Sequence, residues 1–449
     1  MPALHDFATW EPFLRSIRTA NADEIAGGGL HVSGHVQRHG GFGANAHLGD
    51  MAALFQVVTD MGEAFDQAAV DRVAFSVSFA PDGRTVLRIW GSNPAVTSGI
   101  GSPMGALLLV DGAVPEPWRR LPERFPDVAP DASADADLLE RTLRERLPEA
   151  VGASEEELSR AEARLGVALP EEVRALYRVV GGEPPLHGDL DLDALGREAT
   201  AVGFELFPLK EVYVAYAASR HFLWQHGAME VAATVPGAAV QDLPGSPGWI
   251  VVGDTGGGDR IAVDLTPGPG GHTGQLIVIS HEESVGADHV APSLTDWVVH
   301  HVQRGAGRRR GDQPYVAHVN HASVTSIEAA AHPELQVLSL GVWDGEPFSL
   351  AAVTGLPRLR TLAAYPGTLA DPLEIAGLTG LEYLELSSTD WRVLLDADAV
   401  PRTLLAAGVE ERGRPDPRGT VEVANALLAL WGREPIGGKV VEGHLGRSE

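Results

Sequence analysis

The apolar positions in residues 154–182 follow the helical period twice, with a stop after each run. Ser154 can cap the first helix, and Glu157, three residues later, can complete a capping box. The second run opens at Pro170, and two carboxylates follow near the positive end of its helix dipole. The apolar positions are Leu158, Ala161 and Leu165 in the first run, and Val173, Leu176, Tyr177 and Val180 in the second. This pattern predicts a helical hairpin that is closed by glycines.

A different period marks a β-hairpin nearer the N-terminus. Residues 73–79 alternate between apolar and polar side chains, and residues 85–90 form a second apolar run. A Pro-Asp-Gly turn lies between the two runs. Residues 7–17 and 51–60 have helical spacing. The first part of the chain is therefore predicted to be an α+β unit.

A third pattern repeats toward the C-terminus. Leu335, Leu359 and Leu381 each open the motif Leu-x-x-Leu-x-Leu/Ala, and the units are 24 and 22 residues apart. This spacing is similar to that of leucine-rich repeats, in which one short strand per unit lines a curved sheet. The asparagine that usually follows the strand is missing here. Such stacks are interaction surfaces more often than enzymes.

Two segments have the composition of linkers, and they divide the chain into three expected domains. Residues 126–137 are rich in Pro, Ala and Asp, and residues 305–313 contain Gly and three consecutive arginines. We therefore expect an N-terminal α+β domain over residues 1–125, a central domain over 138–304 and a leucine-rich-repeat-like α/β array over 314–449.

The central domain resembles a known family. The order of capped helix, Leu-Gly, Leu-Pro, amphipathic helix and Gly-Gly is similar to the opening of the SMI1/KNR4 (SUKH) superfamily. The resemblance continues in the Trp, Gly-Asp and Gly-rich turn of residues 248–259, the strand at 261–265, and the blocks 274–281 and 294–297. It covers about residues 150–304. The resemblance implies an α+β fold, with helices packed against a mixed sheet.

Charge is the strongest signal in the composition. The 449 residues include 34 basic and 61 acidic side chains, for a net charge of −27, and Lys210 and Lys439 are the only lysines. This surface would repel phosphate backbones, which argues against a nucleic-acid partner, and it would attract a basic protein. Simple acidic solubility is the alternative. With no cysteine, no secretory signal and no apolar run that could span a membrane, a cytoplasmic location without membrane contact is expected.

No group of residues forms a recognisable catalytic or metal-binding motif. The glycine-rich stretch at residues 253–259 lacks the Lys-Ser/Thr of a phosphate-binding loop and the ligand spacing of a calcium loop. A β-hairpin turn is the expected role. No Gly-x-Ser-x-Gly nucleophile turn is present. We therefore expect no enzymatic activity, no cofactor and no metal, with an enzyme as the third alternative.

Function is indicated by the resemblance alone. Many bacterial SUKH proteins resemble immunity proteins that bind and neutralise a toxin, often a nuclease. The resemblance thus implies an immunity-type binder that occludes a basic toxin domain of the polymorphic class. The alternative is a regulatory adaptor, because fungal members of the family resemble signalling adaptors for cell-wall synthesis.

The expected contact residues are acids and aromatics near the concave face of the family fold and near the repeat strands. Trp249 could instead belong to the core, and packing between repeats is the alternative for each aromatic residue in the array. The candidates are Glu183, Trp249, Asp254, Asp259 and Asp264 in the centre, and Trp343, Tyr365 and Trp391 in the repeats.

Overall fold

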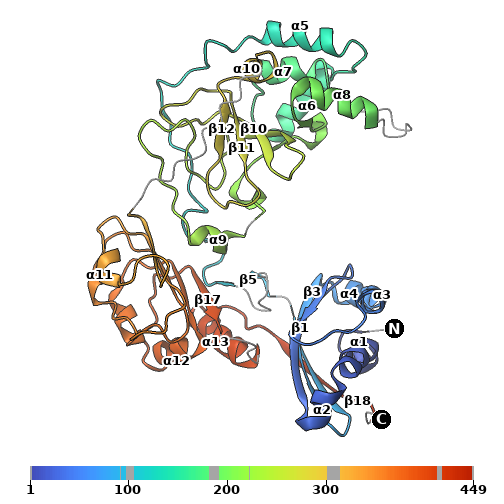
Figure 1. Cartoon of the computed structure of the whole chain (residues 1–449), viewed down its shortest axis with the longest axis vertical. Coiled ribbons are helices and arrows are strands. Elements are labelled where there is room, and N and C mark those ends of the chain that lie inside the picture. The colour runs from blue at the N-terminus through green and yellow to red at the C-terminus, as the bar shows by residue number, and fades with distance from the viewer. Residues whose placement is uncertain are drawn as a thin grey trace. The chain divides into compact units, whose positions relative to one another are not determined.

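The computed structural model describes residues 3–91, 93–97, 106–181, 192–221, 223–300, 314–411 and 417–446. The chain folds into two compact units, one built from its two ends and the other from its middle (Figure 1). The first unit comprises residues 1–114 and 317–449, and the second comprises residues 115–316. Both units combine helices with sheets, which confirms the α+β class.

A five-stranded antiparallel sheet forms part of the first unit, in the order β18-β4-β3-β1-β2. The predicted hairpin is present as the antiparallel pair β3–β4. Strand β18 comes from the C-terminal segment, so both ends of the chain build this sheet. The division into three domains, which separates those ends, stays a prediction. The strands are β1 (Leu30–Gln37), β2 (Phe42–Ala44), β3 (Arg72–Phe79), β4 (Arg84–Trp90) and β18 (Gly438–His444).

Helices cover one face of this sheet, and α1, α3 and α4 lie on the same side of it in Figure 1. The two predicted helices are present as α1 and α3, each with an aspartate whose side chain caps its first turn. The rings of Trp10 and Phe13 pack on Phe75 of β3 at centroid distances of 5.7 and 5.6 Å. The helices are α1 (Phe7–Ala20), α2 (Ala22–Gly28), α3 (Met51–Asp60) and α4 (Gly62–Ala68).

The rest of the first unit is a seven-stranded sheet whose repeats align in register. Leu338, Leu362 and Leu384 are direct neighbours on successive parallel strands, and all three are fully buried. The repeat spacing thus places equivalent leucines side by side in one core, while membership of the leucine-rich-repeat class stays a prediction. The strands run in the order β13 (Val316–Val319), β14 (Val337–Leu340), β15 (Thr361–Ala364), β16 (Tyr383–Ser387), β17 (Ala406–Glu410), β6 (Ala106–Leu108) and β5 (Val96–Thr97).

Short helices connect these strands, and strands β6 and β5 extend the sheet in antiparallel orientation. The helical segments are α11 (Ile327–Ala330), η3 (Ala351–Val353), η4 (Pro372–Gly377), α12 (Ser388–Asp396) and α13 (Pro417–Leu430).

The second unit contains a sheet in the order β12-β11-β10-β9-β7, with β8 also paired to β9. The described pairings in this sheet are all antiparallel. Its two faces contribute to separate hydrophobic clusters, with Ile250 and Val252 on one face and Trp249 and Val251 on the other. The strands are β7 (Glu205–Leu206), β8 (Tyr213–Val214), β9 (Trp249–Asp254), β10 (Arg260–Asp264), β11 (Gln275–Ile279) and β12 (Asp288–Ala291).

The predicted helical hairpin lies in this second unit, and its capping box is present. Ser154 Oγ accepts the Glu157 backbone N–H at 3.3 Å, while the Glu157 carboxylate accepts the Ser154 N–H at 2.7 Å. The helices of this unit are α5 (Ala136–Arg146), α6 (Glu155–Leu165), α7 (Glu171–Tyr177), α8 (Leu192–Val202), α9 (Trp224–Ala228) and α10 (Leu294–Val298), with single turns η1 (Leu209–Glu211) and η2 (Ala217–Ser219).

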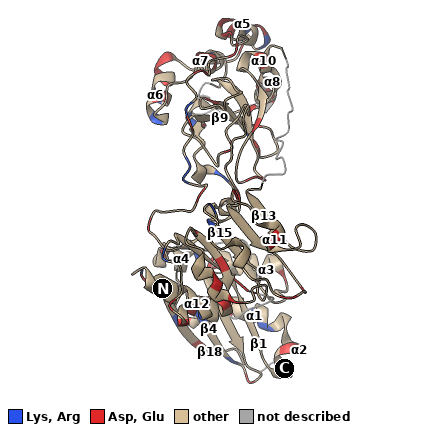
Figure 2. Ribbon diagram, turned by 90° about the vertical axis from the view of Figure 1, so that its left-hand side faces the viewer, with Lys and Arg blue, Asp and Glu red and all other residues tan. Residues whose placement is uncertain are grey.

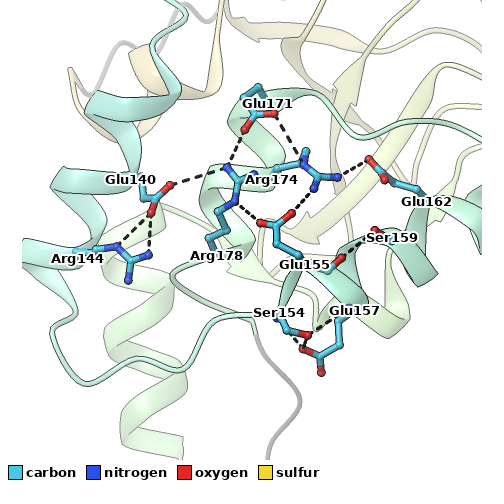
Figure 3. Close-up of polar contacts among 10 residues, drawn as sticks. All are labelled: Glu140, Arg144, Ser154, Glu155, Glu157, Ser159, Glu162, Glu171, Arg174 and Arg178. Carbon is cyan, nitrogen blue, oxygen red and sulfur yellow. Dashed lines mark hydrogen bonds and ion pairs between the residues drawn. The ribbon is translucent and has the colours of Figure 1, made fainter.

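Ion pairs connect α5, α6 and α7 (Figure 3). The contact to α5 is made by Arg178, which lies 4.0 Å from the Glu140 carboxylate. The Arg178 guanidinium contacts the carboxylates of Glu155 and Glu171, each at 2.7 Å. Arg174 contacts Glu162 at 2.8 Å and also Glu155. Glu155 in the first turn of α6 and Glu171 in the first turn of α7 are therefore paired with the same arginine, Arg178.

The segment 126–137, whose composition predicts a linker, is part of the second unit and contacts its other residues at several points. Ser133 Oγ lies 2.9 Å from Ser293 Oγ, and the Asp135 N–H donates to Thr295 Oγ1 at 3.1 Å. Just upstream of this segment, the backbone of Glu123 donates its N–H to the Gln241 side chain and accepts a hydrogen bond from it at its carbonyl.

None of the described helices combines the length and the apolar composition that a membrane-spanning segment needs.

Candidate protein-binding site

The glycine-rich stretch forms the turn between β9 and β10, as predicted. The Asp254 carboxylate accepts the backbone N–H groups of Gly256 at 2.6 Å and Gly258 at 3.2 Å, and it also pairs with Arg260. Gly256 and Gly258 have φ angles of 84° and 99°, a region that strongly favours glycine. Asp254 is therefore the residue that organises the turn, and residues 255–258 are exposed around it.

Asp259 fixes the ring of His281 from the neighbouring strand end. Its Oδ1 accepts both the His281 backbone N–H at 2.8 Å and ring Nδ1 at 2.7 Å. Partial burial acts to raise the pKa of Asp259, but the hydrogen bonds from His281 outweigh it and lower that pKa. Because an ionised carboxylate only accepts hydrogen bonds, His281 Nδ1 carries the hydrogen of this contact.

Further carboxylates surround this turn. Glu205 pairs with Asp254 in the β7–β9 register, and a side chain at Gly256 would lie 3.2 Å from the Glu205 carboxylate. Glu282 is exposed beside His281. We define the hairpin tip as Glu205, residues 254–260, His281 and Glu282. It carries four carboxylates and one guanidinium. Other acidic segments occur along the chain, among them α2 and α6 (Figure 2).

Two of the central candidates lie inside the domain rather than at the tip. Trp249 and Asp264 are direct neighbours in the β9–β10 pairing, and both are fully buried. Trp249 thus packs in the core, which was the alternative interpretation of the sequence. Neither side chain reaches the surface, so a direct contact with a partner is not available to them in this fold. Glu183 lies outside the described residues.

Asp264 anchors a buried polar network. Its carboxylate accepts the Thr266 N–H at 2.8 Å and the Gln275 side-chain amide at 3.0 Å. The Trp249 indole N–H lies close enough to lower the pKa of this carboxyl, but it has no hydrogen-bond partner of normal geometry. Burial dominates and raises the pKa of Asp264 to about 6.

Arg220 is a half-buried residue with a structural role that the sequence pattern does not indicate. Its guanidinium lies 6.0 Å from the Trp249 ring centroid and donates to five backbone carbonyls. Burial lowers the pKa of Arg220 to about 10, so it remains charged at neutral pH. A lone Arg in a polar loop gives no sequence signal for this role. The carbonyls belong to Leu243, Pro244, Ser280, Glu283 and Gly286.

The candidates of the repeat array occupy different environments. Trp343 is half-buried and stacks on His321, with a centroid distance of 4.3 Å. Tyr365 follows β15, is also half-buried, and donates its backbone N–H to Leu340. Trp391 is fully buried in α12, and its indole donates to the Gly408 carbonyl at 2.8 Å. Packing between repeats therefore explains Trp391, whereas Trp343 and Tyr365 retain some exposed surface.

A cavity of about 170 Å³ lies elsewhere in the second unit, between residues 120–125 and the loop 232–243. Gln241, one of the polar residues that line it, binds the backbone of Glu123. Among the described residues, no group of three or more His, Asp and Glu side chains is placed to hold a metal ion. The hairpin tip combines an exposed turn with four carboxylates that come from the ends of different strands.

Comparisons with known proteins show that part of the second unit is similar to a known family. Residues 152–300, about one third of the chain, match the SMI1 / KNR4 family (SUKH-1). A stretch of 66 residues is 38% identical to a glucan synthesis regulatory protein of Neurospora crassa. That alignment covers 15% of this chain and 12% of the fungal protein, so the chain spans a small part of that relative. The family resemblance of the central segment is confirmed.

Proposed function

We propose that this chain is a non-enzymatic protein-binding protein whose hairpin tip contacts a basic protein. The observation that carries the proposal is the geometry of the tip. Asp254 and Arg260 satisfy each other inside the turn, which leaves the exposed carboxylates of Glu205 and Glu282 beside the half-buried Asp259. Such a surface matches lysine and arginine side chains of a partner.

The charge of the whole chain supports the same class of partner. A net charge of −27 raises the rate at which a basic protein meets this surface, and salt screens that attraction. The exposed parts of Trp343 and Tyr365 offer a second contact area in the first unit, where aromatic side chains are suited to act as anchors.

Within this class we propose an immunity-type role, in which the chain occludes a toxin domain. The match to the SMI1/KNR4 family supports a regulatory or an immunity-type protein. A regulatory adaptor is the second candidate, and the partial similarity to a protein named for the regulation of glucan synthesis favours it.

Affinity capture with matched variants tests the binding proposal. Wild-type chain, the tip variant E205K/E282K and the control E63K/E328K would each be used to capture proteins from the native cells at low salt. All four positions are exposed, and both variants change the net charge equally. We expect one basic protein that the wild type and the control retain and the tip variant loses. Equal capture by all three would contradict the assignment of the tip.

The two roles are then separated by expressing the captured partner alone. A toxin would stop the growth of the host cells, and co-expression of the wild-type chain would restore growth. A partner that is harmless when expressed alone would contradict the immunity role and favour the adaptor.

A further inference from the structure

The C-terminal strand β18 leaves one side of the five-stranded sheet open. All seven of its residues pair with β4, from Gly438↔Trp90 to His444↔Arg84, without a register shift. It is the last strand in the sheet order, and none of the described strands pairs with its other side. Strand β18 is therefore a regular edge strand without a bulge.

The direction of each backbone group on β18 follows from two hydrogen bonds at its ends. Gly91 donates to the Gly437 carbonyl, and Leu445 donates to the Gly83 carbonyl, each at 3.0 Å. Because hydrogen-bonded pairs alternate along an antiparallel ladder, the odd-numbered residues of β18 face β4. The N–H and C=O groups that point away from the sheet belong to Gly438, Val440, Glu442 and His444.

This edge lacks most of the devices that usually block strand addition. Its seven residues contain no proline, and the pairing has no bulge. The Val440 side chain is 56% exposed, although it sits near the middle of the strand. The charged side chains of this strand, Lys439 and Glu442, are devices of the usual kind, because a charge on an edge strand discourages unspecific pairing.

The charge beside the edge is opposite to that of the chain as a whole. Lys439 lies on β18, and Arg88 lies directly opposite Val440 on β4. Among the described residues neither cation forms an ion pair, whereas Glu442 is paired with Arg84 at 3.3 Å. Pairing of two copies through this edge would bring the same cations together, and each copy also carries −27. A short acidic segment brings no cations to the edge, and its carboxylates can face Lys439 instead.

We propose that β18 accepts an extended, acidic segment of a partner protein as an additional strand of this sheet. The backbone groups of the four outward residues supply the hydrogen bonds, in the manner of β-strand addition. Lys439 selects acidic side chains on one face of the incoming segment, and Val440, whose side chain lies on the other face, provides an apolar cross-strand contact. This site is independent of the hairpin tip, which attracts basic groups.

Hydrogen exchange resolved to single amides tests the site in the full-length chain. In the free protein, the amides of Val440 and Glu442 should exchange rapidly, while those of Val441 and Gly443 are protected by β4. The probe is a blocked seven-residue peptide of alternating Val and Glu. Its addition should protect the two outward amides selectively. An unchanged exchange pattern with saturating peptide would overturn the proposal.

A substitution pair makes the test independent of folding. V440P removes an outward N–H and leaves the bonds to β4 in place, since proline is tolerated on edge strands, and V440T keeps that N–H. We expect V440P to bind the peptide at least about tenfold more weakly than V440T, with the melting temperatures of both near wild type. Equal binding of both variants, or equal binding of a peptide with Lys in place of Glu, would overturn the proposal. A dimer of the free chain that V440P dissociates would assign the edge to a second copy instead.

Discussion

At the scale of single residues, the second unit depends on two charged groups close to Trp249, the fully buried Asp264 and the half-buried Arg220. Asp264 pairs with Trp249 across the β9–β10 ladder, and Arg220 lies over its ring. Each group is satisfied by hydrogen bonds from or to nearby backbone and side chains, rather than by an opposite charge. Removing a charged group from water is unfavourable, so changes at either residue should alter the free energy of unfolding by a measurable amount.

Asp264 should make the stability of the protein depend on pH. Its pKa of about 6 in the folded chain is above the ordinary value for Asp, so the folded state holds this proton more tightly. The free energy of unfolding should therefore fall as pH rises from about 4 to 6, by up to about 3 kcal/mol, and level off above that range. Urea titrations of wild type and D264N across this range measure the effect. The variant should lack this contribution, and identical pH profiles would contradict the assignment.

Arg220 should be essential to the loops around it. The substitution R220M removes the donors of five carbonyls at once, and a lost buried partner costs about 1–3 kcal/mol per group. We expect a loss of at least about 3 kcal/mol in the free energy of unfolding, together with faster amide exchange in residues 280–286. R164M is a control because Arg164 also donates to backbone carbonyls, but only to two and at a partly buried site. A smaller loss for R220M than for R164M would contradict this account.

At the scale of elements, local sequence signals specify the start of α6. The capping box joins Ser154 and Glu157 within one turn, so it needs no distant residue to form. The substitution S154A should lower the free energy of unfolding by about 1 kcal/mol, because the first turn loses its side-chain acceptor. S159A, in the middle of the same helix, should be close to neutral. Thermal or chemical denaturation of the two variants would show the difference, and equal losses would contradict the capping role.

The turn between β9 and β10 offers a comparison of adjacent glycines. Gly256 and Gly258 have positive φ angles, whereas Gly257 does not, and a side chain at Gly257 would meet only Thr255 Oγ1 at 3.7 Å. G256A and G258A should each cost about 1 kcal/mol or more, and G257A should cost much less. Chemical denaturation of the three variants ranks them. A loss for G257A as large as the others would show that the turn conformation differs in solution.

Elements with local signals could be predicted from the sequence, and elements that depend on distant partners could not. The capped helix α6, the hairpin of β3 and β4, and the glycine turn all appear where their patterns indicate. Strand β18 has no such signal for its partner, because β4 precedes it by about 350 residues. A local pattern describes a strand's own faces, but its neighbours follow from the packing of the whole unit.

The same limit applies to the candidate site. The glycine-rich turn indicated the position of Asp254 and Asp259, because turn chemistry is local. The burial of Asp264 could not be predicted, since an aspartate at a strand end is usually solvated. The contact between Asp259 and His281 could not be predicted either, because it joins the ends of two different strands.

At the scale of the whole molecule, charge separates the two proposed contact surfaces. The chain carries −27 overall and has four carboxylates at the hairpin tip, while Lys439 at the β18 edge forms no ion pair within the part of the chain that the structure describes. Salt should therefore weaken the contact of a basic protein with the tip, and this effect should be smaller for the tip variant, which has lost part of the attraction.

Calorimetric titration of the captured basic partner with purified chain tests the central claim most directly. Wild type, E205K/E282K and the charge-matched E63K/E328K would be compared at low and at physiological salt. We predict that the tip variant binds at least about tenfold more weakly than the control variant at both salt concentrations, because it places cations at the contact itself. Equal losses in the two variants would mean that only net charge matters, and they would contradict the assignment of the tip as the binding site.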